Sequence, residues 1–154
     1  MWPQGRGRRI VDPVQTPVST SEAVSRSMKA NRRTGTGPER RVRSVLHRLG
    51  LRFRKDYLVT VAGVRVRVDI AFPRRRVAVF VDGCFWHSCN RHGSLPKTNV
   101  LFWQQKLRKN VERDALVTQA LSAAGWQVVR IWEHEEVGAA ASQVASVVGG
   151  RGPL

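Results

Sequence analysis

A continuously apolar strand pattern that runs into a cluster of polar side chains is the feature that most constrains how this chain can fold. The segment 77–81 contains no polar residue, which is typical of a strand buried on both faces within a sheet. Directly after it, eleven positions hold an aspartate, two cysteines and two histidines: Asp82, Cys84, His87, Cys89 and His92. A buried strand therefore brings metal-ligand and acid–base side chains to one end of the predicted sheet.

The residues before this strand predict a helix and an antiparallel meander. Thr36 and Glu39 form a capping-box pair, Pro38 suits a first helical turn, and Gly50 ends the pattern. The apolar stripe of this helix is Val42, Val45, Leu46 and Leu49. Strand patterns follow at 57–61, 64–72 and 77–81, and the short breaks between them imply antiparallel neighbours.

Alternation within the second strand predicts where its aspartate points. Val64, Val66, Val68 and Ile70 alternate with Arg65, Arg67, Asp69 and Ala71. Because successive side chains of a strand point to opposite faces, Asp69 is expected on the face opposite to the valines and Ile70.

A helix, a strand and a weaker helix complete the predicted order. The pattern over 99–124 has an apolar stripe of Val100, Trp103, Leu107, Val111 and Leu121, and Gly125 closes it. A buried strand is expected at 126–132 and a helix at 136–148. The core order is αβββαβ, which predicts an α/β fold with a mixed β-sheet flanked by helices. We expect a flexible basic arm at 1–36, a folded domain at 37–135 that carries the polar cluster, and a C-terminal helix and tail at 136–154.

Charge points to a phosphate-rich partner. The chain carries 27 Lys and Arg against 11 acidic residues, a net charge of +16, and the segment before Pro38 accounts for only +5 of it. Nucleic acid is the natural partner for such a surface, although a ribosomal-type or chromatin-like binder has the same composition. No apolar run approaches the ~18 residues of a membrane span, and the N-terminus lacks the apolar stretch of a signal peptide. We expect a cytoplasmic, nucleoid-associated protein.

The acid–base residues suit metal-assisted phosphodiester hydrolysis. Asp69 is the best candidate for a ligand of a divalent cation, and the backbone carbonyl of Val81 on the adjacent strand is a second. His87 is placed to deprotonate or orient water, and Glu39 to hold metal-bound waters. The alternatives are an arginine ion pair for Asp69, a purely capping role for Glu39 and a surface position for His87.

Two cysteines and two histidines make a tetrahedral zinc set with no position left for water: Cys84, Cys89, His92 and His134. Such a site would join the loop after the third strand to the end of the last one. Glu135 or water could replace His134, the most distant member.

Several residues are candidates for DNA contact. Phe85 and Trp86 are adjacent aromatics in a loop, and they could wedge between base pairs or cover the metal site. Phosphate contacts are expected from Lys97, Lys106, Asn110 and Arg113, of which the last three share one helical face. A solvated helix face is the plain alternative.

Several dispersed blocks in order resemble the very short patch repair endonucleases, bacterial enzymes that nick DNA beside a T:G mismatch. The resemblance spans about 25–135. Its carriers are Arg26-Ser27-Met28, Pro38-Glu39, Leu49 to Arg54, Val68-Asp69-Ile70, Val79 to His87, Pro96 to Asn99, Phe102-Trp103, Lys106, Asn110 to Asp114, Gly125-Trp126 and Ile131-Trp132-Glu133.

The resemblance implies a restriction-endonuclease-like fold and assigns roles by position. Asp69 would bind Mg²⁺ together with the Val81 carbonyl, His87 would be the general base and Glu39 would support the metal waters. Met28, Phe85 and Trp86 would intercalate beside the mismatch. Some relatives have a histidine at the position of Asp82, where it assists near the scissile phosphate. A carboxylate at this position is expected to help hold metal, because it is less suited to donate a proton. The family's zinc positions match Cys84, Cys89 and His134, whereas His92 is inferred from its chemistry.

The sequence thus predicts a Mg²⁺-dependent, strand-specific DNA endonuclease with a structural Zn²⁺, which nicks 5′ to the thymine of a T:G mismatch left by deamination of 5-methylcytosine. The expected partner is mismatched double-stranded DNA, bound by a monomer, with mismatch-repair proteins and a repair polymerase as further candidates. The rivals are a non-catalytic zinc-stapled DNA-binding module and a related nuclease with another DNA substrate.

Overall fold

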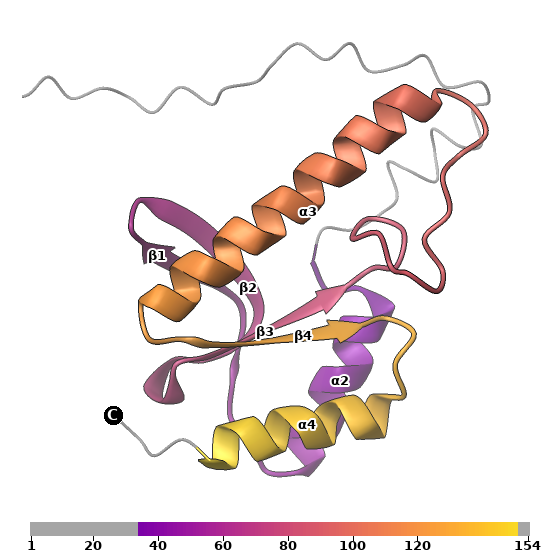
Figure 1. The fold of residues 1–154 in the computed structure, drawn as a ribbon. Helices are drawn as coiled ribbons and strands as arrows, with labels where there is room; N and C mark the ends of the chain where they lie inside the picture. Colours follow the sequence, from indigo (N-terminus) through magenta and orange to yellow (C-terminus); the bar gives the residue numbers. More distant parts are fainter. Residues whose placement is uncertain (1–33, 151–154) are drawn as a thin grey trace, which may run out of the picture. The chain divides into compact units, whose positions relative to one another are not determined.

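The computed structural model describes residues 34–150, and Met28 lies outside them. Figure 1 shows a mixed sheet between helices. The elements are α2 (Gly37–Arg48), β1 (Arg54–Val61), β2 (Val64–Phe72), a 3₁₀ turn (Pro73–Arg75), β3 (Val77–Asp82), α3 (Val100–Ala123), β4 (Gln127–Trp132) and α4 (Val137–Gly150). The expected fold class and the αβββαβ core order are confirmed.

The apolar strand β3 lies inside the sheet. The strand order is β1-β2-β3-β4. The strands β1, β2 and β3 form the expected antiparallel meander, and β4 runs parallel to β3 from Val77 to Asp82. A strand with neighbours on both sides and helices over both faces has no room for polar side chains, which explains the apolar run.

Two apolar clusters lie on opposite faces of the sheet. One lies between the sheet and the helices α2 and α4, and its fully buried members include Leu46, Val79 and Val144. The other is covered by α3, and Leu121 is its fully buried helical residue. The C-terminal helix α4 is therefore an integral part of the core around the sheet, and the result is three layers (Figure 1).

Helix α2 begins as its sequence predicts. The Thr36 hydroxyl oxygen accepts a hydrogen bond from the Glu39 N–H at 3.5 Å. The Glu39 carboxylate in turn accepts from the Thr36 hydroxyl at 3.0 Å and from the Gly35 N–H at 2.7 Å. Leu49 was expected in the apolar stripe, but it is the C-cap and 53% exposed. Gly50 follows with a φ of +77°, a conformation that favours glycine and ends the helix.

The predicted stripe of α3 is only partly buried. Trp103, Leu107 and Leu121 are buried, whereas Val100 and Val111 are exposed. At 3.6 residues per turn, Val111 lies about 80° around the helix axis from both Trp103 and Leu121, so it points away from the sheet. Val100 stands in the first turn of the helix.

The alternation in β2 does not continue past its aspartate. Val66 and Val68 belong to the cluster under α3, as expected, but Ile70 belongs to the opposite cluster and Ala71 to that of the valines. The register between β1 and β2 gives no pair for Asp56, whose φ of +49° departs from strand geometry. Asp69, which lies opposite, is not paired either. The alternation shifts by one residue at this interruption of the ladder, so the expectation of one face for all four apolar residues is wrong.

None of the helices within residues 34–150 is both long enough and apolar enough to cross a lipid bilayer.

Core packing of α2 provides a test of the fold. Leu46 is fully buried, whereas Leu49 on the same helix is 53% exposed. Leu46→Ala is expected to lower the free energy of unfolding by about 3 kcal/mol, because it removes buried apolar surface and leaves a cavity. Leu49→Ala should change it by less than about 0.5 kcal/mol. Urea denaturation of both variants measures these values, and similar losses from the two would contradict the described packing of α2.

Candidate active site

The Asp69 carboxylate lies where β2 and β3 separate. The last paired residues of these two strands are Ile70 and Val79. Beyond this pair, the Val81 N–H donates to Asp69 Oδ2 at 2.8 Å. The N–H and C=O of one strand residue face the same side, so the Val81 carbonyl is directed to the same gap. Carboxylate and carbonyl oxygens are suitable ligands for a hard divalent cation. The two candidate ligands therefore lie side by side.

Burial and nearby charges make this carboxylate receptive to a cation. Burial raises the pKa of the Asp69 carboxyl to about 7, against the lowering effect of the Val81 N–H. The negative charges of Glu39 and Asp82 raise this pKa further. Because no ion pair with arginine is described for Asp69 among residues 34–150, nothing supports that alternative. A cation at this gap would relieve the repulsion between the carboxylates.

Glu39 caps α2 and also faces this site. The residue is 3% exposed, and both side-chain oxygens accept hydrogen bonds. Its charge is close enough to act on Asp69. Capping and support of metal-bound water are thus compatible roles, because each carboxylate oxygen has more than one acceptor position.

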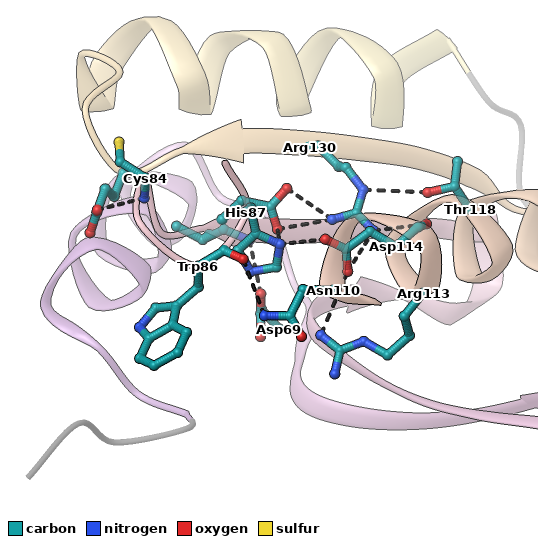
Figure 2. Close-up of polar contacts among 12 residues, drawn as sticks. Asp69, Cys84, Trp86, His87, Asn110, Arg113, Asp114, Thr118 and Arg130 are labelled. Carbon is teal, nitrogen blue, oxygen red and sulfur yellow. Dashed lines mark hydrogen bonds and ion pairs between the residues drawn. The ribbon is translucent and has the colours of Figure 1, made fainter. Parts of the chain in front are cut away.

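His87 is held by a carboxylate that the sequence analysis had not assigned. Its Nδ1 atom makes a very short contact with Asp114 Oδ2 from α3 (Figure 2). Both side chains are about one-fifth exposed, at 20% and 19%. An imidazole whose Nδ1–H donates to a carboxylate presents Nε2 as a base. His87 is thus an oriented side chain and not a plain surface histidine.

Asp82 forms an ion pair with an arginine of β4. Arg130 Nη1 donates to both Asp82 oxygens, at 2.9 and 2.8 Å. Asp82 Oδ1 also lies 3.7 Å from His87 Nδ1. The aspartate is 5% exposed, and a carboxylate so deeply buried requires such a partner.

The predicted zinc ligands come together. The ligand atoms of Cys84, Cys89, His92 and His134 all lie within 4.8 Å of one another. Each Sγ lies between 3.1 and 3.9 Å from the two Nδ1 atoms. Tetrahedral zinc with ordinary bond lengths requires about 3.5 Å between sulfur and nitrogen, so the residues fit that ion. Glu135, the substitute considered for His134, accepts instead from the Trp132 N–H.

This cluster joins the two strand ends, as predicted. Cys84, Cys89 and His92 follow β3 in the chain, and His134 follows β4. A second link runs in parallel, because the Cys84 N–H donates to Glu133 Oε1 at 2.7 Å.

Phe85 and Trp86 form an aromatic cluster with the first turns of α3. Trp103 lies 5.4 Å from the Phe85 ring centroid and 6.0 Å from that of Trp86. The Lys106 Nζ atom is 5.5 Å from the Trp86 ring and 5.3 Å from the Trp103 ring. Asn110 Nδ2 donates to the Trp86 carbonyl at 3.2 Å. Lys106 and Asn110 thus support the aromatic loop, while their contact with phosphates stays a prediction.

Lys97 and Arg113, the other two expected phosphate contacts, are exposed. Arg113 Nη2 lies 3.7 Å from Asp114 Oδ1 and Lys97 stands in the loop before α3, so both are available to DNA.

Sequence reasoning missed Asp114 and Arg130. A signal for the first was present, because Asp114 follows Lys106 and Asn110 at steps of four and so shares their helix face. Arg130 is the one charged residue of β4 and stands between the buried Val129 and Ile131. An isolated arginine in an apolar strand indicates a buried partner of opposite charge.

The fold and the site suit a DNA endonuclease, and comparison with known proteins agrees. The family described as DNA mismatch endonuclease Vsr matches residues 16–92. The chain is 52% identical over 133 residues to the type II nicking enzyme V.NaeI of Lentzea aerocolonigenes, covering 86% of this chain and 80% of that enzyme. It is 36% identical over 110 residues to the DNA mismatch endonuclease Vsr of Escherichia coli, covering 71% and 68%. A type II nicking enzyme of Xanthomonas oryzae, V.XorIIP, is 39% identical over 127 residues.

This chain belongs to the Vsr family of DNA mismatch endonucleases. It is therefore a DNA-acting hydrolase, and the rival of a non-catalytic zinc-stapled module is not supported.

Proposed function

We propose that the protein is a Mg²⁺-dependent endonuclease that nicks one strand of duplex DNA 5′ to the thymine of a T:G mismatch, leaving a 3′-hydroxyl and a 5′-phosphate. The observation that carries the proposal is the position of the Asp69 carboxylate beside the Val81 backbone, next to an imidazole oriented by Asp114. A metal-ligand pair and a base on one side of a strand end are what phosphodiester hydrolysis requires. Nicking of a single strand agrees with the names of two relatives.

In the proposed step, His87 accepts the proton that the attacking water loses. His87 Nε2 takes a proton from a water molecule as the water oxygen bonds to phosphorus, and Asp114 stabilises the resulting imidazolium. The bond from phosphorus to the 3′ oxygen of the preceding nucleotide breaks in line, and water protonates that oxygen. A bound Mg²⁺ supplies polarisation of the phosphate and charge neutralisation. Asp69 and the Val81 carbonyl would hold it, with Glu39 accepting from its waters.

Zn²⁺ is proposed for the Cys84, Cys89, His92 and His134 cluster. Because all four positions are filled by protein ligands, this ion would be structural. Its role is to fix the loop that carries Phe85, Trp86 and His87 between the ends of β3 and β4.

Mismatch selection is proposed to use the Phe85 and Trp86 rings. A T:G pair is weaker than a matched pair, so inserting an aromatic wedge beside it costs less unstacking energy. The net charge of +16 provides salt-sensitive affinity for any duplex. Preference between duplexes would therefore arise at the wedge, while most of the affinity arises from the phosphates.

Nicking assays on matched duplexes test the reaction. We expect Mg²⁺-dependent cleavage of the T strand in a T:G duplex and about a thousandfold less in the same duplex with T:A. Asp69→Asn should reduce cleavage of the T:G duplex by about a thousandfold, because it weakens the metal site. Glu112→Gln is the control, since Glu112 is an exposed residue of α3 that forms an ion pair with Arg108.

Each alternative outcome has a distinct meaning. Equal cleavage of T:G and T:A duplexes would indicate an endonuclease of another specificity. Full activity of Asp69→Asn with normal thermal stability would contradict the assigned metal site.

The Asp114 carboxylate is expected to act on the rate and not on binding. Asp114→Asn should reduce the single-turnover rate by about a hundredfold or more, because the imidazole loses its acceptor and its fixed orientation. The apparent affinity for DNA should change less than about threefold. Glu112→Gln, on the exposed side of α3, is the control. A loss of binding without a loss of rate would contradict this assignment.

Metal analysis tests the Zn²⁺ cluster. The purified chain should contain about one equivalent of zinc, and Cys84→Ser should lose it and unfold at least about 3 kcal/mol more easily. Asn90→Ala, in the same loop, should retain the metal. A zinc-free native protein of unchanged stability would contradict a structural zinc.

A further inference from the structure

Arg130 contacts both carboxylates that flank the catalytic imidazole. Its Nη1 donates to Asp82. Its Nη2 donates to the Asp114 backbone carbonyl at 3.3 Å and lies 3.8 Å from Asp114 Oδ1. Its Nε donates to Thr118 Oγ1 at 3.3 Å (Figure 2). All three guanidinium nitrogens are thus engaged, and the group also lies 4.8 Å over the Phe80 ring.

Two carboxylates are close to a single imidazole N–H. The distance from His87 Nδ1 to Asp82 Oδ1 is 3.7 Å, too long for a hydrogen bond, whereas Asp114 makes the short contact. Arg130 Nη1 donates to both Asp82 oxygens and so holds this carboxylate at that distance from the ring. Without the guanidinium, a 5% exposed carboxylate would need another donor, and the nearby imidazole N–H is available.

We infer that Arg130 is a positioning residue of the endonuclease: by holding Asp82 and the Asp114 backbone, it leaves Asp114 as the sole acceptor for His87 and so fixes the ring. Its side chain is 25% exposed, and each of its three nitrogens donates a hydrogen bond within the protein, so we assign it to this scaffold. The inference rests on the proposed role of His87 as the base. It also assigns Asp82 a function through Arg130 in place of the expected metal contact.

The strand register explains how one arginine reaches both carboxylates. Phe80 of β3 is aligned with Arg130 of β4. Asp82 stands two residues after Phe80 and therefore points to the same face. That face is covered by α3, which supplies Asp114 and Thr118. A planar guanidinium with fixed donor directions can join these three elements, and a lysine ammonium cannot do so in the same geometry.

A double-mutant cycle tests the inference. Arg130→Met should lower the single-turnover nicking rate about tenfold or more, since a ring displaced by about 1 Å reacts far more slowly, with apparent DNA affinity within about twofold. In an Asp82→Asn background, Arg130→Met should cost less than about threefold, because no charged competitor remains. An equal loss in both backgrounds would overturn the inference. Arg108→Met, of an 83% exposed arginine on α3, is the control.

A second readout does not depend on catalysis. In the DNA-free holoprotein, the ¹H and ¹⁵N chemical shifts of the His87 Nδ1–H report its hydrogen bond to Asp114. These shifts should change in Arg130→Met and return in the double variant. Arg130→Lys should give an intermediate rate, and it replaces Arg130→Met if that variant does not fold. Unchanged Nδ1–H shifts in a folded Arg130 variant would overturn the inference.

The two proposals fail separately. If His87→Ala retains full nicking, the assigned base is wrong, whatever the Nδ1–H shifts of the native ring show. If His87→Ala abolishes nicking but Arg130→Met is as active as Arg108→Met, only the positioning role is wrong.

Discussion

The hydrogen bond from the Val81 N–H to the Asp69 carboxylate is the interaction on which the site depends. It replaces a main-chain bond at the point where β3 leaves β2, while β3 stays paired with β4 as far as Asp82. The carboxylate is thereby fixed within the sheet with its remaining acceptor positions directed to the gap. Because strands of a sheet are more rigid than loops, a ligand pair built in this way needs little reorganisation when metal and DNA bind.

The catalytic histidine, in contrast, lies in a loop and depends on cross-links. The segment between β3 and α3 has no regular helix or strand, and ordering it costs backbone entropy of about 1–2 kcal/mol per residue. The Cys/His cluster, the Glu133 contact with the Cys84 N–H and the Asp114 contact with His87 each restrain it. A base on a loop thus gains the fixed geometry that strand residues have by default.

The sequence predicts the elements well because their signals are local. The Thr36 and Glu39 pair, the apolar β3 and the helix over 99–124 each depend on residues within a few turns or one strand. The side-chain partners across the site are different in kind. His87 and Asp114 are 27 positions apart, and Asp82 and Arg130 are 48 apart. No periodicity relates such pairs, and the shift of alternation at Asp69 depends on the backbone of a neighbouring strand. The tertiary arrangement alone brings these groups together.

The charges of the chain act at two ranges. Four of its 11 acidic residues, Glu39, Asp69, Asp82 and Asp114, gather in the site, within a chain of net charge +16. Screening limits the field of each exposed charge to about 8 Å at physiological ionic strength, so an approaching duplex meets the basic surface before it meets these carboxylates. At the site itself the carboxylates would repel a phosphate unless a divalent cation lay between them. Metal binding and DNA binding are therefore expected to reinforce each other, because each supplies the charge that the other lacks.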